Sequence, residues 1–479
     1  MFLLCLAAGN SAFSQTTKNS TEATDEDVAG KVEGKNAGLP LGLIQKHEVL
    51  PEMEIDKELY SDGDEKEYLR KYKTAFENAL KSNAPNDDEK KALEAGAKYW
   101  VYRFSMKKYR EEEVPKKGAA AAKGPTQDRL HDLRKKLLDM IKVYAKTPGA
   151  RDYFLKQVTD KCGQLLDNNY VVRQNIILLL GSLSSSYPAP GAKNADPTPY
   201  EPAYAELLKV IKDDKQHQAL KIDALIGLLR ICRLGLPLPD GNNDKKRSEI
   251  AMALVPELVK KDTHWWYQAR LAECLGAASV IYDAVGNKGS PIVLQTLAEV
   301  VADDKRHLQV RVEAAKAIGR LPLDNQLNMV PVVYHIVRLG GQIVLAHNAN
   351  PKKEPWGNYF FTPQPQLGFG LYYAFRAENS TAKLPGGKRK PGLLDSPVNA
   401  KEIKEAYEQI LPMTLHFLDN PGKPVAAAQL GNIETWLKNH EPANARITAG
   451  SPALGAKSEP ENAKKNSAPP ATTPSGGSP

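Results

Sequence analysis

Apolar residues recur along the middle of the chain at intervals that predict pairs of amphipathic helices. In four segments, an apolar residue with a polar or basic successor is followed by further apolar residues four and eight positions later. Residues spaced in this way form one stripe of an α-helix. The four stripes are Val172/Ile176/Leu180, Leu220/Ala224/Leu228, Tyr267/Leu271/Leu275 and Val310/Ala314/Ile318.

A second helix is predicted upstream of each of these four. Its apolar positions also have helical spacing, and a short polar turn separates it from the helix that follows. Asp and Asn suit such turns because they cap helix N-termini and tolerate turn geometry. The apolar positions of the upstream helices are Leu155/Val158/Cys162/Leu165, Leu207/Leu208/Ile211, Leu254/Val255/Leu258 and Val293/Leu297/Val300.

The helix pairs repeat in sequence as well as in pattern. Residues Asp213–Leu225 (DDKQHQALKIDAL) return ninety positions later as Asp303–Ala315 (DDKRHLQVRVEAA), and the four stripes begin 48, 47 and 43 residues apart. Sequence that repeats at a near-constant interval predicts structure that repeats. A helix pair at this interval is typical of two-helix α-solenoids, in which each pair stacks on its neighbours.

The second helix of each pair resembles the second helix of a HEAT repeat. The resemblance covers residues 150–322 and implies a scaffold that serves as an interaction platform, without catalytic residues. One copy matches throughout and a second matches nearly as well, while two copies each depart at one position. The full match is Val310-Arg311…Ala314…Ile318-Gly319, and the near match is Val172-Arg173…Ile176…Leu180-Gly181. The copy with Lys221 has Leu229 at the glycine position, and the copy with Gly276 has Gln268 at the basic position.

We therefore expect an all-α fold: an α-solenoid of HEAT-like helix pairs with disordered N- and C-terminal segments. Polar or Pro/Ala/Ser-rich stretches without periodicity set the limits of the folded part. The predicted organisation is a signal peptide at 1–14, a largely disordered segment at 15–58, a helical hairpin that caps the solenoid at 59–113, a linker at 114–126, HEAT-like helical repeats at 127–345, an aromatic, Pro- and Gly-rich insertion at 346–400, a terminal helix pair at 401–440 and a disordered tail at 441–479.

The first residues predict export. Residues 1–8 are apolar, and Ala12-Phe13-Ser14 before Gln15 has the small-x-small pattern of a signal cleavage site, although no basic residue precedes the apolar run. We expect a periplasmic or extracellular location. No other apolar stretch approaches the roughly 18 residues of a membrane span, so we expect no transmembrane segment in the mature chain.

The charge of the chain does not favour nucleic acid as a partner. The formal net charge is +8 over 479 residues, and Lys and Arg are interleaved with Asp and Glu. A nucleic-acid-binding protein more often has a concentrated basic stripe. Nucleic-acid binding is therefore a third hypothesis, which predicts steep salt dependence.

Three cysteines, Cys162, Cys232 and Cys274, lie in apolar helical stretches. We interpret them as buried free thiols that act as small hydrophobic residues, and a Cys232–Cys274 bridge between adjacent units is the alternative. There is no Cys-x-x-Cys, His-x-His or His-x-x-x-His sequence, so we expect no metal site and no cofactor.

Repeated polar positions are interpreted as structural. His217 and His307 occupy equivalent places in two repeats, which predicts a shared role at a helix start. Arg173, Lys221 and Arg311 are also in register, and we expect them to pair at the surface with Asp residues of neighbouring turns; the alternative is a basic ladder along one inner edge. Exposed pairs of this kind contribute only ~0–1 kcal/mol each.

The candidate partner-binding residues are aromatic. Aromatic side chains dominate binding hot spots because each buries a large area at low entropic cost. The alternative is that these rings pack onto the helices and seal them. The candidates are Trp265 and Trp266 at the start of a repeat helix, and Trp356, Tyr359, Phe360, Phe361, Phe369, Tyr372 and Tyr373 in the insertion.

The sequence contains no catalytic motif: Gly-x-Ser-x-Gly, a P-loop, a dinucleotide-binding glycine pattern and His-Glu-x-x-His are all missing. We expect a non-enzymatic exported scaffold that binds a protein partner through a helical-repeat surface. The alternative is an enzyme or cofactor-handling protein on a HEAT-like frame, similar to the HEAT-like lyases that attach pigments.

Overall fold

The structure, a computed structural model, describes residues 57–110, 130–189, 196–236, 245–284, 289–349, 364–376, 392–420 and 422–455. This part of the chain is all-α apart from one short antiparallel ribbon, β1 (Ser184–Ser186) and β2 (Thr198–Pro199), and an isolated bridge between Arg446 and Ala453. Within it, no helix combines the length and apolar character that crossing a bilayer requires. The chain divides into two units, Met1–Pro51 and Glu52–Pro479, and every described residue belongs to the second.

The predicted N-terminal hairpin is present with a break in its first arm. The arm contains two helices because Tyr72, with a φ of −113°, departs from helical geometry between them. Ser61 and Asn86 each form a capping box with the acidic residue three positions on, and these boxes fix where the helices start. The elements are α1 (Asp62–Lys71), α2 (Lys73–Ala79), α3 (Asp87–Tyr102), the 3-10 turn η1 (Arg103–Ser105) and α4 (Lys107–Arg110).

Helix pairs then follow one another along the chain. The first helix after the predicted linker, α5, begins at Leu130. The predicted terminal pair coincides with α16 and α17 to within a few residues. The elements are α5 (Leu130–Tyr144), α6 (Pro148–Gly163), α7 (Tyr170–Ser182), η2 (Glu201–Ala203), α8 (Tyr204–Lys212), α9 (Gln218–Arg230), the π-turn η3 (Ile231–Gly235), α10 (Lys245–Val259), α11 (Trp265–Ala278), α12 (Ile292–Ala302), α13 (Leu308–Ile318), α14 (Val330–Ala349), α15 (Gln364–Phe375), η4 (Leu393–Asp395), α16 (Ala400–Asp419) and α17 (Ala427–Asn439).

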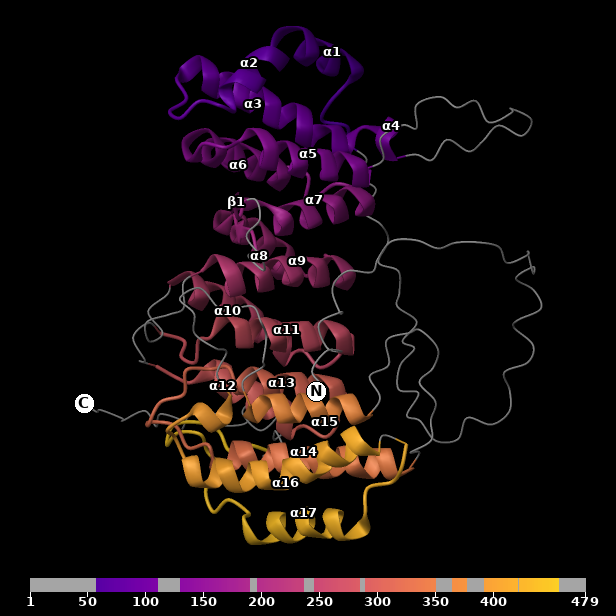
Figure 1. Cartoon of the computed structure of the whole chain (residues 1–479), viewed down its shortest axis with the longest axis vertical. Helices are drawn as coiled ribbons and strands as arrows, with labels where there is room; N and C mark the ends of the chain where they lie inside the picture. Colours follow the sequence, from indigo (N-terminus) through magenta and orange to yellow (C-terminus); the bar gives the residue numbers. More distant parts are fainter. Residues whose placement is uncertain are drawn as a thin grey trace, which may run out of the picture. The chain divides into compact units, whose positions relative to one another are not determined.

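Helices in equivalent positions of successive pairs lie side by side (Figure 1). Along one series α7 packs on α9, α9 on α11, α11 on α13 and α13 on α15; along the other, α8 packs on α10, α10 on α12 and α12 on α14. The two helices of each pair also contact each other, as α8 does α9 and α12 does α13.

The apolar stripes predicted from the sequence form the core. Every residue of the four second-helix stripes is buried, and so is every apolar position named above for the four upstream helices. This confirms the helical spacing as the origin of the fold, since burial of apolar surface is the dominant favourable contribution to folding. Loss of one such leucine to alanine costs about 2–5 kcal/mol.

The glycine of the repeat motif marks where two neighbouring second helices come closest. A Cβ atom on Gly181 would lie 3.0 Å from the Cα of Gly227 in α9, and one on Gly276 would lie 2.7 Å from the Cα of Ala317 in α13. The facing residues Gly227 and Ala317 are themselves small. At these two junctions the position requires glycine because the backbones of adjacent second helices meet there.

His217, His264 and His307 are all N-cap residues, which confirms the predicted role at a helix start. In each case Nδ1 accepts a hydrogen bond of 3.2 Å from the backbone N–H two residues on. The residue at the start of the preceding second helix contacts the cap: Tyr170 meets His217 edge to face, and the Oε1 of Gln218 accepts from the His264 N–H at 2.9 Å.

The repeated basic residues are buried, so the prediction of exposed surface pairs is wrong. Arg173, Lys221 and Arg311 are 2–6% exposed. Arg311 pairs with Asp304 at 3.1 Å as expected, but Lys221 pairs with Glu257 at 3.1 Å, and Arg173 donates to Gln216 at 2.7 Å. Because an unpaired buried charge is costly, loss of one partner from these contacts destabilises the fold more than loss of an exposed pair would.

Residues 441–455, assigned from the sequence to the tail, pack against the helices. Asn328 donates from its backbone N–H to the carbonyl of Ile447 at 2.8 Å, and Gln295 donates from Nε2 to the carbonyl of Pro452 at 3.3 Å. Ile447 and Leu454 are buried. We call residues 445–454 the C-terminal strap. The predicted signal peptide, the linker at 114–126 and the tail beyond residue 455 lie outside the described residues.

Candidate partner-binding surface

Helix α15 forms inside the predicted insertion and presents some of its aromatic residues to the surface. Its buried side chains, Leu367, Leu371, Ala374 and Phe375, have the spacing of a single helical stripe. α15 packs on α13 as α13 packs on α11. The helical-pair pattern therefore continues into this region, where the sequence appeared irregular because Pro, Gly and aromatic residues dominate it.

Two glycines hold α15 tightly between its neighbours. A Cβ on Gly368 would lie 2.5 Å from the ring of Phe417 in α16, and one on Gly370 would lie 2.3 Å from a methyl group of Val312 in α13. At about 3.6 residues per turn, Phe369 falls midway between these two glycines, on the side opposite the buried stripe. The packing of α15 therefore directs Phe369 outward.

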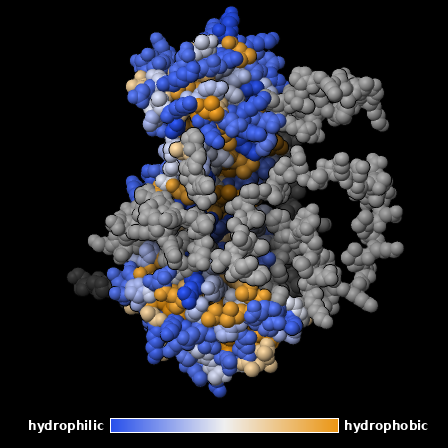
Figure 2. Space-filling view, viewed as in Figure 1, coloured by the Kyte–Doolittle hydropathy of each residue, from blue (hydrophilic) through white to orange (hydrophobic). Residues whose placement is uncertain are grey.

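Three of the predicted binding residues share this outward side of α15. Phe369, Tyr372 and Tyr373 are each half-buried. The Tyr372 ring lies 5.5 Å from that of Tyr373 and 6.2 Å from that of Tyr407 in α16, and burial raises the pKa of Tyr372. In Figure 2 apolar residues come to the surface over the region of α15.

A basic residue borders these aromatics. Arg376 is exposed; its guanidinium carbon lies 5.1 Å from the centre of the Tyr407 ring, and its Nε donates to the Tyr407 hydroxyl at 3.3 Å. That hydrogen bond raises the pKa of Arg376. The edge of the aromatic group is thus positively charged.

Helix α16 adds two exposed leucines that the sequence analysis missed. Leu415 is 47% and Leu418 61% exposed. They adjoin Thr414 and Phe417, the residues of α16 that contact Gly368. We call the set Phe369, Tyr372, Tyr373, Arg376, Leu415 and Leu418 the α15–α16 surface. The two leucines could have been found from the sequence, because Leu411/Leu415/Leu418 form a second apolar stripe that is offset from the core stripe of the same helix.

Comparison of the chain with protein-family models, curated proteins and solved structures finds no match. The α15–α16 surface is therefore interpreted from its own chemistry.

The predicted tryptophans at the start of α11 divide between two roles. Trp265 is partly buried and stacks on the imidazole of His307, with ring centroids 4.9 Å apart and planes 20° apart. Trp266 is 41% exposed. α11 and α15 both pack on α13, so the tryptophans and the α15–α16 surface belong to different helices of one series. Trp356, Tyr359, Phe360 and Phe361 lie outside the described residues.

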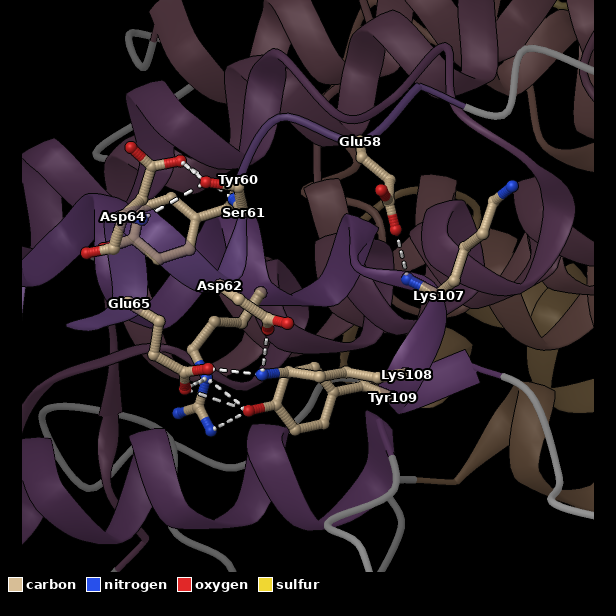
Figure 3. Close-up of polar contacts among 10 residues, drawn as sticks. Glu58, Tyr60, Ser61, Asp62, Asp64, Glu65, Lys107, Lys108 and Tyr109 are labelled. Atoms are coloured by element: carbon tan, nitrogen blue, oxygen red, sulfur yellow. Dashed lines mark hydrogen bonds and ion pairs between the residues drawn. The ribbon is translucent and has the colours of Figure 1, made fainter.

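A cluster of charged side chains joins the N-terminal helices. Figure 3 shows Lys108 and Tyr109 directed toward α1, where Lys108 contacts Asp62 at 2.7 Å and Glu65, and the Tyr109 hydroxyl donates to Glu65 at 3.0 Å. Burial alone would lower the pKa of Lys108, but its hydrogen bonds to the two carboxylates raise it well above the ordinary value.

Arg103 occupies the centre of this cluster. It is buried, pairs with Glu65 at 3.1 Å, and places its guanidinium 4.6 Å from the Tyr99 ring centre and 4.7 Å from that of Tyr109. An arginine enclosed by aromatic rings and paired with a carboxylate already has its partners. We therefore interpret the cluster as the clasp that holds α1 to the turn after α3.

One hollow of about 330 Å³ lies where α5 meets the β1–β2 ribbon. Arg230 lines it but is fully engaged: its guanidinium donates to the carbonyls of Gly181, Leu183 and Pro197 and to Oγ of Ser184, at 2.8–3.3 Å. Arg230 thus fastens the ribbon to α9. Among the described residues, no group of three or more His, Cys, Asp or Glu side chains is placed to hold a metal ion.

Proposed function

We propose that this protein is a non-enzymatic, exported scaffold that binds a protein partner through the α15–α16 surface. The observation that carries the proposal is the outward aromatic side of α15. Its half-buried rings are bordered by Arg376, and α16, on which α15 packs, carries the exposed Leu415 and Leu418. Aromatic residues with arginine are the side chains most enriched at protein-binding hot spots.

The proposed frame is an α-solenoid of HEAT-like pairs. Three observations support it: the sequence period, the contact of each helix with its equivalent in the next pair, and the glycine at the closest approach. Stacked pairs of this kind offer a long, preformed surface, so binding requires little ordering of the scaffold.

Export is proposed from residues 1–14, which have the apolar run and small-x-small site of a secretory signal. Fractionation of cells that express the full chain tests it. Recovery of a shortened chain outside the cytoplasm supports export, whereas an unprocessed chain confined to the cytoplasm contradicts it.

A photocrosslinking experiment tests the binding surface. A photoreactive phenylalanine analogue replaces Phe369 or Tyr373 in the full chain, and in a matched control it replaces Tyr72, which is 38% exposed at the junction of α1 and α2. We expect the same protein adduct from the two α15 positions and no such adduct from position 72. Adducts of equal yield from all three positions, or from none, would contradict the proposal.

A second hypothesis, an enzyme or cofactor-handling protein on a HEAT-like frame, rests on the sequence resemblance. It predicts a bound absorbing ligand or a turnover that survives disruption of the α15–α16 surface. An ultraviolet–visible spectrum of the purified full chain distinguishes the two.

A further inference from the structure

The contact between α9 and α11 differs from the other contacts between second helices. At the α7–α9 and α11–α13 junctions, the motif glycine faces a small residue, Gly227 or Ala317. At the α9–α11 junction, Leu229 stands where the motif has glycine. The helix continues there into the π-turn η3, a local widening that is frequent at functional sites.

Two cysteines occupy this junction. Cys274 in α11 lies 47 residues after Gly227 and 43 before Ala317, so it holds the register of the small facing residue. Cys232 lies in η3. The two thiols are in hydrogen-bonding contact with each other, and η3 packs on α11. Both side chains are buried, and neither is part of a disulfide.

The residues on either side fix the pair in place. Arg233, next to Cys232, forms an ion pair of 2.8 Å with Glu273, next to Cys274. The buried Arg247 donates at 2.8 Å to the carbonyl of Cys232 and at 2.8 Å to that of Ala277, so one guanidinium ties η3 to the end of α11. The thiol contact is therefore flanked by two ties across the junction, the Arg233–Glu273 ion pair and the bridging guanidinium of Arg247.

We propose that Cys232 and Cys274 form a redox modification site, which a disulfide-bearing oxidant converts to a covalent link between two adjacent helix pairs. The S–H bonds of both cysteines break and one S–S bond forms. The two electrons and two protons pass to the oxidant, such as oxidised glutathione, whose S–S bond is cleaved to two thiols. The reaction needs no metal.

Access determines when the link forms. The hydrogen bond with Cys232 and then burial hold the pKa of Cys274 well above its ordinary value, so the folded junction keeps the thiol protonated and unreactive. Exchange takes place during folding or when the junction opens. The proposed export would expose the chain to an oxidising compartment, but the chemistry does not depend on it.

The test uses the full-length C5S/C162S variant, in which Cys232 and Cys274 are the remaining cysteines. The reduced, denatured chain refolds in a glutathione redox buffer and is then denatured and alkylated. We expect both thiols to resist alkylation, the intact mass to fall by two hydrogens, and a peptide map to contain the Cys232–Cys274 link. The thermal midpoint should rise by several degrees, and a reductant should reverse the rise.

The control variants are C5S/C162S/C274S and C5S/C162S/C232S, each of which leaves one cysteine of the pair. We expect these to keep an alkylatable thiol or to acquire one glutathione. The proposal is overturned if the C5S/C162S variant keeps two alkylatable thiols after oxidative refolding, acquires two glutathiones, or crosslinks between chains. A link that lowers the thermal midpoint would also overturn it, because the folded junction would then not accommodate the bond.

Discussion

The indole of Trp265 stacks on the imidazole of His307, and Nδ1 of that imidazole caps α13 by accepting the N–H of Gln309. A residue at the start of one second helix thus positions the cap of the next. The capping role requires Nδ1 to be unprotonated, since an imidazolium has no acceptor. A positive charge at a helix N-terminus is also unfavourable.

We predict that this cap makes the stability of the protein acid-sensitive. Burial, and then the nearby His264, lowers the pKa of His307 below its ordinary value. The unfolded chain therefore binds a proton first, so stability is complete above pH ~6.5 and falls as the pH decreases. The H307N variant keeps a capping side chain that does not titrate, and its thermal midpoint should fall less between pH 7 and 5 than that of the wild type.

The matched control for this prediction is H131N, which alters an exposed histidine of α5. Its pH profile should follow the wild type. Identical profiles for wild type, H307N and H131N would show that the cap does not titrate in this range.

His335 in α14 should contribute a second acid-sensitive step. Burial, and then Arg338 and Arg311, lowers the pKa of His335 to about 4. Between pH ~6.5 and ~4 protonation favours the unfolded chain, and the loss reaches ~3 kcal/mol at the lower limit. Urea unfolding of wild type and H335Q at pH 7 and 4.5 measures this loss of stability. The difference in the free energy of unfolding between the two proteins should narrow or reverse at low pH. A constant difference would contradict the prediction.

Gly276 should not tolerate a side chain. A Cβ there would lie 2.7 Å and 2.9 Å from backbone and side-chain carbons of Ala317, so G276A should destabilise the protein by about 1–3 kcal/mol. Gly431 in α17 is the control, because nothing lies within 4 Å of its Cβ position. G431A should stabilise by up to ~1 kcal/mol through helix propensity. Chemical denaturation of both variants measures the change in the free energy of unfolding. Equal changes for G276A and G431A would argue against a close helix contact at Gly276.

The buried Glu257 should matter more than its exposed neighbour Asp214. Glu257 accepts from the Tyr267 hydroxyl at 2.7 Å and pairs with Lys221 at 3.1 Å, and both partners are buried. E257Q removes the carboxylate that is ion-paired with the buried Lys221 and should cost about 3 kcal/mol. D214N removes a surface ion pair with Lys260 and should cost no more than ~1 kcal/mol. Similar midpoints in denaturant for the two variants would contradict this ranking.

Apolar spacing was sufficient to predict the helices that lie in the repeats, because each stripe must be buried by its neighbours. Leu271 and Ile318 could be placed in the core from the sequence for this reason. The same reasoning missed α15, although Leu367, Leu371, Ala374 and Phe375 have helical spacing. Two glycines lower the helix propensity of this segment, and the packing that they permit against Phe417 and Val312 is a tertiary effect.

The candidate surface could be predicted only in part. Aromatic composition led to Phe369, Tyr372 and Tyr373, but Trp265, from the same reasoning, stacks on a cap instead. The sequence shows which helical stripe a residue belongs to. It does not show how much of that side chain the neighbouring helices leave exposed. Leu415 and Leu418 were missed because the sequence does not distinguish an exposed leucine from a buried one.

The C-terminal strap changes how the final helices can come apart. Its hydrogen bonds to Gln295 and Asn328 join residues 157 and about 120 positions apart, whereas the helices themselves contact close neighbours in sequence. An array with nearest-neighbour contacts alone frays from its ends. The C-terminal strap is bound to α12 and to the start of α14, so the intervening helices form a closed loop. We expect these helices to unfold together once the strap detaches.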